Sequence, residues 1–152
     1  MNETAFRIMG LHTKIERNTK LSKQLKVLAG TCLFFSFCYC HGTKNIEMID
    51  KSQALLTNIV WIISFIILAG LFMKDSYCAK NNKVTELAIY NLEVEELNNK
   101  KEVAKIKGEM LPDYIINKQI DIPDEKVSLP IIYYSILLGL DIVIRISMIG
   151  II

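Results

Sequence analysis

The stretch FFSFCYCHG (34–42) ends an apolar run with three side chains that could do chemistry: Cys38, Cys40 and His41. Thiol and imidazole groups this close together could bind a metal, form a disulfide or accept a lipid. Zinc, however, prefers four ligands, which usually come as two pairs, and this stretch offers no second pair. Cys78 follows a second apolar run, whose far end we expect at the opposite face of a membrane. We therefore expect the three side chains only to pack at the outer end of a membrane helix, with no metal bound.

The sequence has no motif of a known catalytic or cofactor-binding site. It contains no Gly-rich phosphate loop, no H-E-x-x-H and no G-x-S-x-G. Its two histidines, His12 and His41, lie on segments that we place on opposite sides of a membrane. A hydrolase triad or a metal centre would have few groups to draw on, so we expect no enzyme activity and no cofactor.

Two charged residues, Asp141 and Arg145, interrupt the last apolar block of the chain. They are four residues apart and therefore share one face of a helix. A charged residue at bilayer depth costs about 2.5–3.5 kcal/mol on insertion scales, so such residues usually face protein or water. The pair is the candidate functional site, as a pore-lining or inter-subunit charge. Two alternatives stay open: the residues neutralise each other within one helix, or the block lies in the membrane interface.

Three apolar blocks dominate the sequence: 27–43, 52–73 and 127–152. The second block holds 22 residues without a charge, and about 20 apolar residues in a helix span the hydrocarbon core of a bilayer. The first block holds 17 residues, and Lys26 can extend it by reaching the interface. We predict an all-α integral membrane protein with a transmembrane hairpin, a long cytoplasmic helix and a third, C-terminal hydrophobic helix that spans the bilayer or lies in its interface.

A soluble protein with buried core helices is the main alternative to this fold class. Hydrophobic residues make up 51% of the 152 residues, and the mean hydropathy is +0.30. A chain of this length has too little polar surface to enclose three such helices. No small-x-small cleavage site follows the first apolar block, so we expect an uncleaved anchor there and not a signal peptide.

The positive charges predict which segments are cytoplasmic, because short cytoplasmic segments are enriched in Lys and Arg. The leader, 1–26, carries six of these residues, the loop 44–51 carries two, and the segment 74–126 carries nine. We therefore place the leader and 74–126 in the cytoplasm and the loop outside, in a multi-pass protein of the cell membrane. The net charge of +2 is too small to indicate nucleic-acid binding.

Both cytoplasmic segments are predicted to be helical. In the leader, Ile8, Leu11 and Ile15 recur at spacings of three and four, and lysines occupy much of the other face. This helix either lies on anionic lipid or packs on the central segment. The central segment is predicted to be one long helix that ends at Gly108, followed by a partly folded connector that contains Pro112.

The order of segments, with the leader KIERNTKLSKQLKVLAG and the later stretch YCAKNNKVTELAIYNLEVEEL, resembles the SLATT proteins over about Arg7 to Leu97. Those are two-transmembrane effectors of prokaryotic nucleotide-signalling defence systems. The resemblance implies an antiviral defence effector that forms a homo-oligomer, and then a pore or another membrane perturbation, when a separate nucleotide-signalling sensor protein triggers it. The third apolar block departs from the two-span plan. The alternative function is a non-enzymatic membrane scaffold or subunit that docks a cytoplasmic partner through its central helix.

Overall fold

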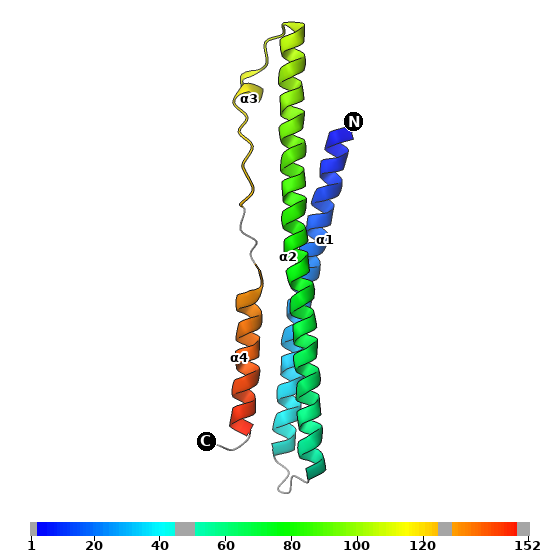
Figure 1. The fold of residues 1–152 in the computed structure, drawn as a ribbon, viewed down its shortest axis with the longest axis vertical. Coiled ribbons are helices and arrows are strands. Elements are labelled where there is room, and N and C mark those ends of the chain that lie inside the picture. The colour runs from blue at the N-terminus through cyan, green and yellow to red at the C-terminus, as the bar shows by residue number, and fades with distance from the viewer. Residues whose placement is uncertain (1–2, 45–50, 125–128, 149–152) are drawn as a thin grey trace. The chain divides into compact units, whose positions relative to one another are not determined.

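The computed structural model describes residues 3–44, 51–124 and 129–148, and these residues form four α-helices and no strand (Figure 1). The helices are α1 (Glu3–Lys44), α2 (Lys51–Lys107), α3 (Asp113–Ile116) and α4 (Ile131–Met148). The predicted all-α class is therefore confirmed for the described part of the chain. Residues 45–50, which make up most of the predicted outer loop 44–51, lie outside it.

Two of the predicted segment boundaries fall inside continuous helices. The leader and the first apolar block both belong to α1, and the second apolar block and the central segment both belong to α2. The polarity of the sequence changes near Lys26 and near Lys74, but the three prolines of the chain all come after α2. Because proline is the residue that most strongly interrupts a helix, the backbone can continue through both changes of polarity.

The C-terminal end of α2 is a Schellman cap, which confirms the cap predicted at Gly108. Gly108 has a left-handed backbone conformation with φ +66°. Its N–H donates to the carbonyl of Lys105 (3.4 Å), and the N–H of Glu109 donates to the carbonyl of Ala104 (3.0 Å). These bonds satisfy two of the carbonyls that every helix end leaves free. The chain then enters the connector, where α3 forms a single turn after Pro112.

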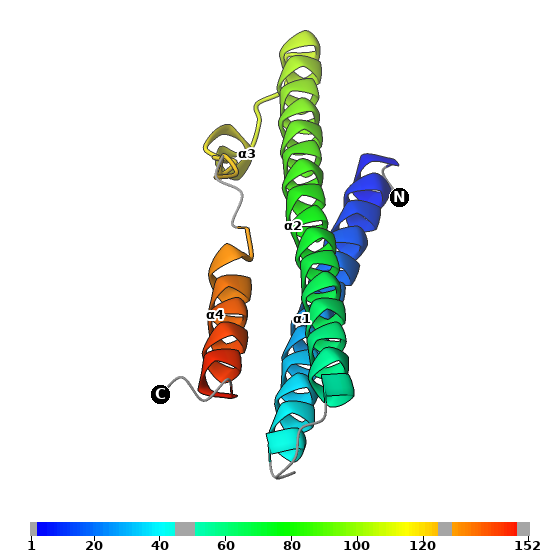
Figure 2. The same ribbon diagram turned by 60° about the horizontal axis from the view of Figure 1, so that its bottom comes forward.

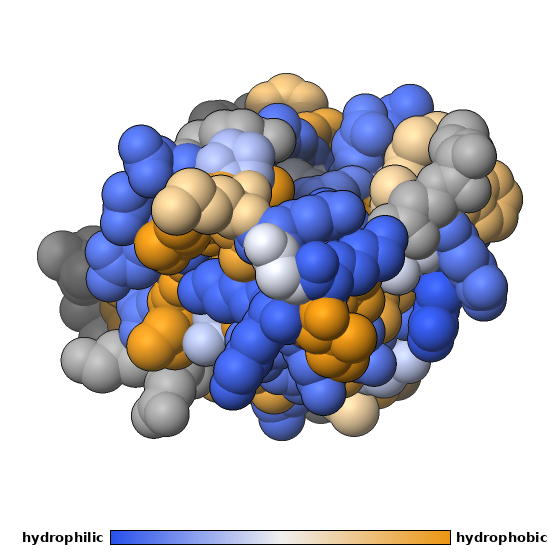
Figure 3. Space-filling view, turned by 90° about the horizontal axis from the view of Figure 1, so that it is seen from above, coloured by the Kyte–Doolittle hydropathy of each residue, from blue (hydrophilic) through white to orange (hydrophobic). Residues whose placement is uncertain are grey.

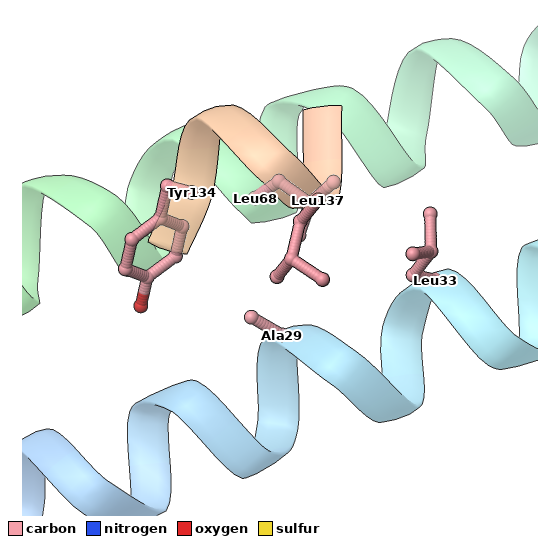
Figure 4. Close-up of a cluster of buried hydrophobic side chains, with 5 residues drawn as sticks. All are labelled: Ala29, Leu33, Leu68, Tyr134 and Leu137. Carbon is pink, nitrogen blue, oxygen red and sulfur yellow. The ribbon is translucent and has the colours of Figure 1, made fainter. Parts of the chain in front are cut away.

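The chain divides into two compact units, and unit 2 comprises residues 20–79 and 128–152. Its core brings together one face of each of three helices, as the close-up in Figure 4 shows. The core residues are Ala29 and Leu33 from α1, Leu68 from α2, and Tyr134 and Leu137 from α4. These side chains pack against one another, and the close contacts between them stabilise the unit.

Within unit 2, α4 lies beside α2 in both ribbon views (Figures 1 and 2). The ring of Tyr134 packs edge-on against Phe72 of α2, with 5.4 Å between the ring centroids. The hydroxyl of Tyr133 donates to the backbone carbonyl of Lys26 in α1 at 2.7 Å. The start of α4 is therefore attached to both helices of the hairpin.

Unit 1 comprises residues 1–19 and 80–127. In this unit the first part of α1 packs on the second part of α2: the amide of Asn82 donates to the hydroxyl of Thr19 (3.3 Å), and Leu11 shares a shallow groove with Ala88 and Leu92. Of the two roles predicted for the leader, packing on the central segment agrees with these contacts. Figure 3, seen from the end where α2 terminates, shows mostly hydrophilic side chains with hydrophobic ones between them.

Candidate functional site

Asp141 and Trp61 connect α4 to α2 inside unit 2. Asp141 is 3% exposed, and its Oδ2 accepts a hydrogen bond of 2.7 Å from the indole Nε1–H of Trp61. A hydrogen bond to a charged group contributes about 1.5–3 kcal/mol. Since the indole N–H can only donate, this contact requires an acceptor at position 141.

Arg145 also contacts α2, one turn further along α4. Its guanidinium carbon lies 3.8 Å from the centroid of the Trp61 ring, which makes a cation–π stack. Its Nη2 donates to the Oδ1 of Asn58 at 2.5 Å. The indole therefore contacts both charged residues, Asp141 through its N–H and Arg145 through its face. We call Asn58, Trp61, Asp141 and Arg145 the α2–α4 latch.

The latch gives both charged residues of α4 a partner within one chain. Polar groups at bilayer depth have no water to bond, so they are satisfied by other protein groups. Asp141 and Arg145 share a face of α4, as the spacing of four predicted, and that face is turned toward α2. Each charged side chain already has a hydrogen-bond partner on α2 of the same chain. A pore-lining or inter-subunit role for the pair therefore stays a prediction.

Sequence reasoning found Asp141 and Arg145 but missed Trp61 and Asn58. Each of the missed residues carried a signal, since Trp61 is the single tryptophan of the chain and Asn58 is an amide inside the apolar block 52–73. The sequence does not contain the alignment of α4 against α2, which decides which residues face each other. That alignment is set by the packing of side chains along both helices.

Unit 2 buries several polar side chains beside its apolar core and exposes many large apolar ones. Its buried polar residues are Ser36, Ser64, Asp75 and Asp141. Exposed large apolar side chains occur on all three helices, among them Phe34 and Phe35 on α1, Ile62, Ile63 and Ile66 on α2, and Ile132, Ile136 and Val143 on α4. Monomeric soluble proteins rarely expose contiguous apolar patches of more than a few hundred Å². The many exposed apolar side chains of unit 2 favour an apolar surrounding.

Among the described residues, one helix is long and apolar enough to cross a membrane, Leu55–Lys107, and only 11% of its most apolar stretch is buried. A core helix of a soluble protein would instead be mostly buried. The predicted spans 27–43 and 127–152 both include residues that lie outside the described side chains. The length and composition of α2 suit a membrane span, and membrane crossing by α1, α2 and α4 stays a prediction.

The described cysteines form no metal centre. Cys38 is exposed, Cys32 is half-buried and Cys78 is buried, all three as free thiols. The described residues contain no group of three or more His, Cys, Asp or Glu side chains that could hold a metal ion. The side chains of Cys40 and His41 lie outside the described residues, so the packing expected there stays a prediction.

No protein-family model, no curated protein and no solved structure matches this chain. The resemblance to the SLATT proteins therefore remains a prediction from the order and pattern of the segments. Three features of the chain bear on its function: the apolar outer surface of unit 2, the latch and the surface of unit 1.

Proposed function

We propose that the chain is a multi-pass membrane protein, with the apolar part of unit 2 in the bilayer and residues 1–26 and 74–126 in the cytoplasm, that acts as a non-enzymatic scaffold or subunit. The observation that carries this proposal is the apolar outer surface of unit 2. In a lipid surrounding, apolar side chains can face outward without penalty, whereas polar side chains bond to each other inside. The latch provides such bonds for the two charged residues of α4.

Unit 1 supplies the surface that would meet a cytoplasmic partner. It contains a groove of about 450 Å³ in which Arg7, Glu95 and Lys100 lie beside the apolar Leu92 and Val103. Ligand-binding clefts usually measure about 300–1,000 Å³. Charged side chains around an apolar floor are suited to docking a helix or a loop, because the floor supplies contact area and the charges fix its orientation.

An arginine on the outer face of unit 2 tests the proposed membrane location. Ile63 is an exposed residue near the middle of the block 52–73. We expect Ile63→Arg to reduce insertion, because arginine at the helix centre costs about 2.5–3.5 kcal/mol on the insertion scale. The measurement is the fraction of the expressed protein that stays with membranes after an alkaline carbonate wash.

The matched control is Val84→Arg, on the same helix but in unit 1, where the side chain is also exposed. This variant should insert like the wild type, because its arginine stays in water. A soluble protein would tolerate both substitutions, since each replaces an exposed apolar side chain with a charge. Equal membrane retention of the two variants, or wild-type protein released by the wash, would contradict the membrane location.

A second candidate function is the oligomeric, pore-forming effector that the SLATT resemblance implies. The observation that favours it is the open space beside two glycines of unit 2, Gly70 and Gly139, where an added Cβ would meet nothing within 4 Å. Small residues on exposed helix faces let neighbouring membrane helices approach closely. Copies of unit 2 could therefore pack against each other through these faces.

The size of the protein in mild detergent and its ion flux in liposomes separate the two candidates. A scaffold should be a small assembly that conducts no ions, whereas an effector should form a ring-sized assembly that does. If ions pass, Asp141→Asn should lower the preference for cations only where Asp141 lines the pore. If the ion selectivity of Asp141→Asn equals that of the wild type, Asp141 does not line the pore and acts only in the latch.

A further inference from the structure

In unit 1, α1 covers one side of α2 and leaves another side open. On the covered side, Thr85 and Ile89 are 2% and 7% exposed. On the open side, Val84 is 68% exposed and Leu87 is 52% exposed. Both lie in the segment 74–126, which we place in the cytoplasm, so lipid would not cover them as it would cover the apolar residues of unit 2. Single exposed apolar residues are common on protein surfaces, and it is the spacing of these two within a longer row that indicates a partner.

The exposed row on α2 has the spacing of a coiled-coil seam, with steps of three and four residues in turn. In unit 1 the row consists of Lys80, Val84, Leu87, Asn91, Val94 and Asn98. Val94 is half-buried, and the other members are exposed. In the sequence the same steps continue back from Tyr77 to Leu56, and each residue of the row in that part of α2 is exposed as well. A repeat that averages 3.5 residues keeps its members on one face of a supercoiled helix, where a second helix packs. We call this row, from Leu56 to Asn98, the α2 seam.

The polar members of the α2 seam indicate which helix covers it. Asn91 and Asn98 are seven residues apart and so take equivalent places in successive repeats; Asn91 borders the shallow groove beside Leu11 and is still exposed. An asparagine side chain both donates and accepts hydrogen bonds, so it can pair with an identical asparagine. In parallel coiled coils an asparagine at a seam position fixes the register and the number of strands. Lys80 can lay its apolar stem along the seam and keep its ammonium group in water. The seam is therefore complementary to its own copy.

We propose that the α2 seam binds the α2 helix of a second copy of this chain, as a parallel two-stranded coiled coil. The inference deepens the proposed function and rests on it for the orientation, because two copies inserted in one membrane with the same topology have parallel α2 helices. Confinement to a bilayer also raises the effective concentration of the copies, so a seam with few apolar residues in its cytoplasmic part is sufficient. The seam shares no residue with the groove of unit 1 that contains Arg7 and Leu92. The dimer would therefore present two such grooves to cytoplasmic partners.

Disulfide cross-linking of the full-length chain, without its native cysteines and in lysed cells free of detergent, tests the seam. Leu87→Cys places a thiol on the seam, and Glu86→Cys places one on the adjacent residue, which is exposed but off the seam. Equivalent seam positions of two parallel helices lie within reach of a disulfide, so oxidation should convert most of the Leu87→Cys protein to a dimer and almost none of the Glu86→Cys protein. Asn98→Cys should cross-link as well, because an antiparallel pair could bring equivalent residues together at one of these two positions but not at both.

Val84→Arg, combined with Leu87→Cys, should lose most of the cross-linked dimer, because two arginines would face each other across the seam. Glu86→Arg in the same background adds an arginine off the seam and should keep the dimer. Equal cross-linking at Leu87 and Glu86, cross-linking at only one of Leu87 and Asn98, or a product whose mass differs from two copies would overturn the seam. Protein that resists the carbonate wash but does not cross-link would overturn the seam and keep the membrane location. Protein that the wash releases but that cross-links at both seam positions would keep the seam and contradict the membrane location.

Discussion

A thiol introduced at Asn45 should react with a membrane-impermeant maleimide in intact cells, and a thiol introduced at Lys105 should not. The excess of Lys and Arg in the leader and in 74–126 predicts that these segments are cytoplasmic and that the 44–51 loop is outside. Lys105 is an exposed residue in the last turns of α2. After the cells are permeabilised, both positions should react, so the expected contrast is all-or-none. The measurement is the labelled fraction of each single-cysteine protein.

Native Cys78 lies in the predicted cytoplasmic segment 74–126, but it cannot serve as the thiol that reports a cytoplasmic position. Its side chain is 2% exposed, and burial raises the pKa of its thiol, so less of the reactive thiolate is present at neutral pH. It would stay unlabelled on either side of the membrane. The reporters therefore belong in a chain whose four native cysteines have been replaced by serine or alanine. Labelling at Lys105 and not at Asn45 in intact cells would reverse the orientation.

The helical content and one helix end could be predicted from the sequence because their causes are local. Gly108 ends α2 as predicted, since glycine is the residue that most readily adopts the left-handed conformation of the cap. The hydropathy of the sequence does not show that α1 and α2 are continuous, because a change of hydropathy marks the edge of a lipid-facing surface and not the end of a helix. Val27 and Lys74 change the polarity of their helices without breaking the backbone.

The contacts of the candidate site could be predicted only in part, because they depend on residues far apart in the chain. The spacing of four showed that Asp141 and Arg145 share a face, but Trp61 lies 80 residues before Asp141. Asp75 follows Lys74 at the end of an apolar block, which is where an ordinary solvated charge would be expected. In the structure Asp75 is 1% exposed, three residues after Phe72, whose ring packs against Tyr134 of α4.

Exchanging the two charged residues of α4, Asp141→Arg with Arg145→Asp, should destabilise the protein by about 3–5 kcal/mol, the range found when a buried charge loses its partner. The exchange keeps both charges and their spacing of four. It places a guanidinium at the buried position 141, against the indole N–H of Trp61, where two donors would face each other. Asn58 can adapt by turning its amide, but Trp61 has no acceptor to offer. The measurement is the shift of the thermal unfolding midpoint in mild detergent.

The matched variant is Asp141→Asn, whose side-chain oxygen can still accept the hydrogen bond from Trp61. It should cost less, about 1–2 kcal/mol, because a neutral acceptor replaces a charged one. If the two charges only neutralise each other within α4, we expect Asp141→Asn to lose more stability than the exchange. The exchange would preserve their attraction, and Asp141→Asn would remove it. Which of the two variants has the lower unfolding midpoint therefore decides between a latch that joins two helices and a charge pair within α4. A midpoint for the exchanged protein at or above that of Asp141→Asn would rule out the latch.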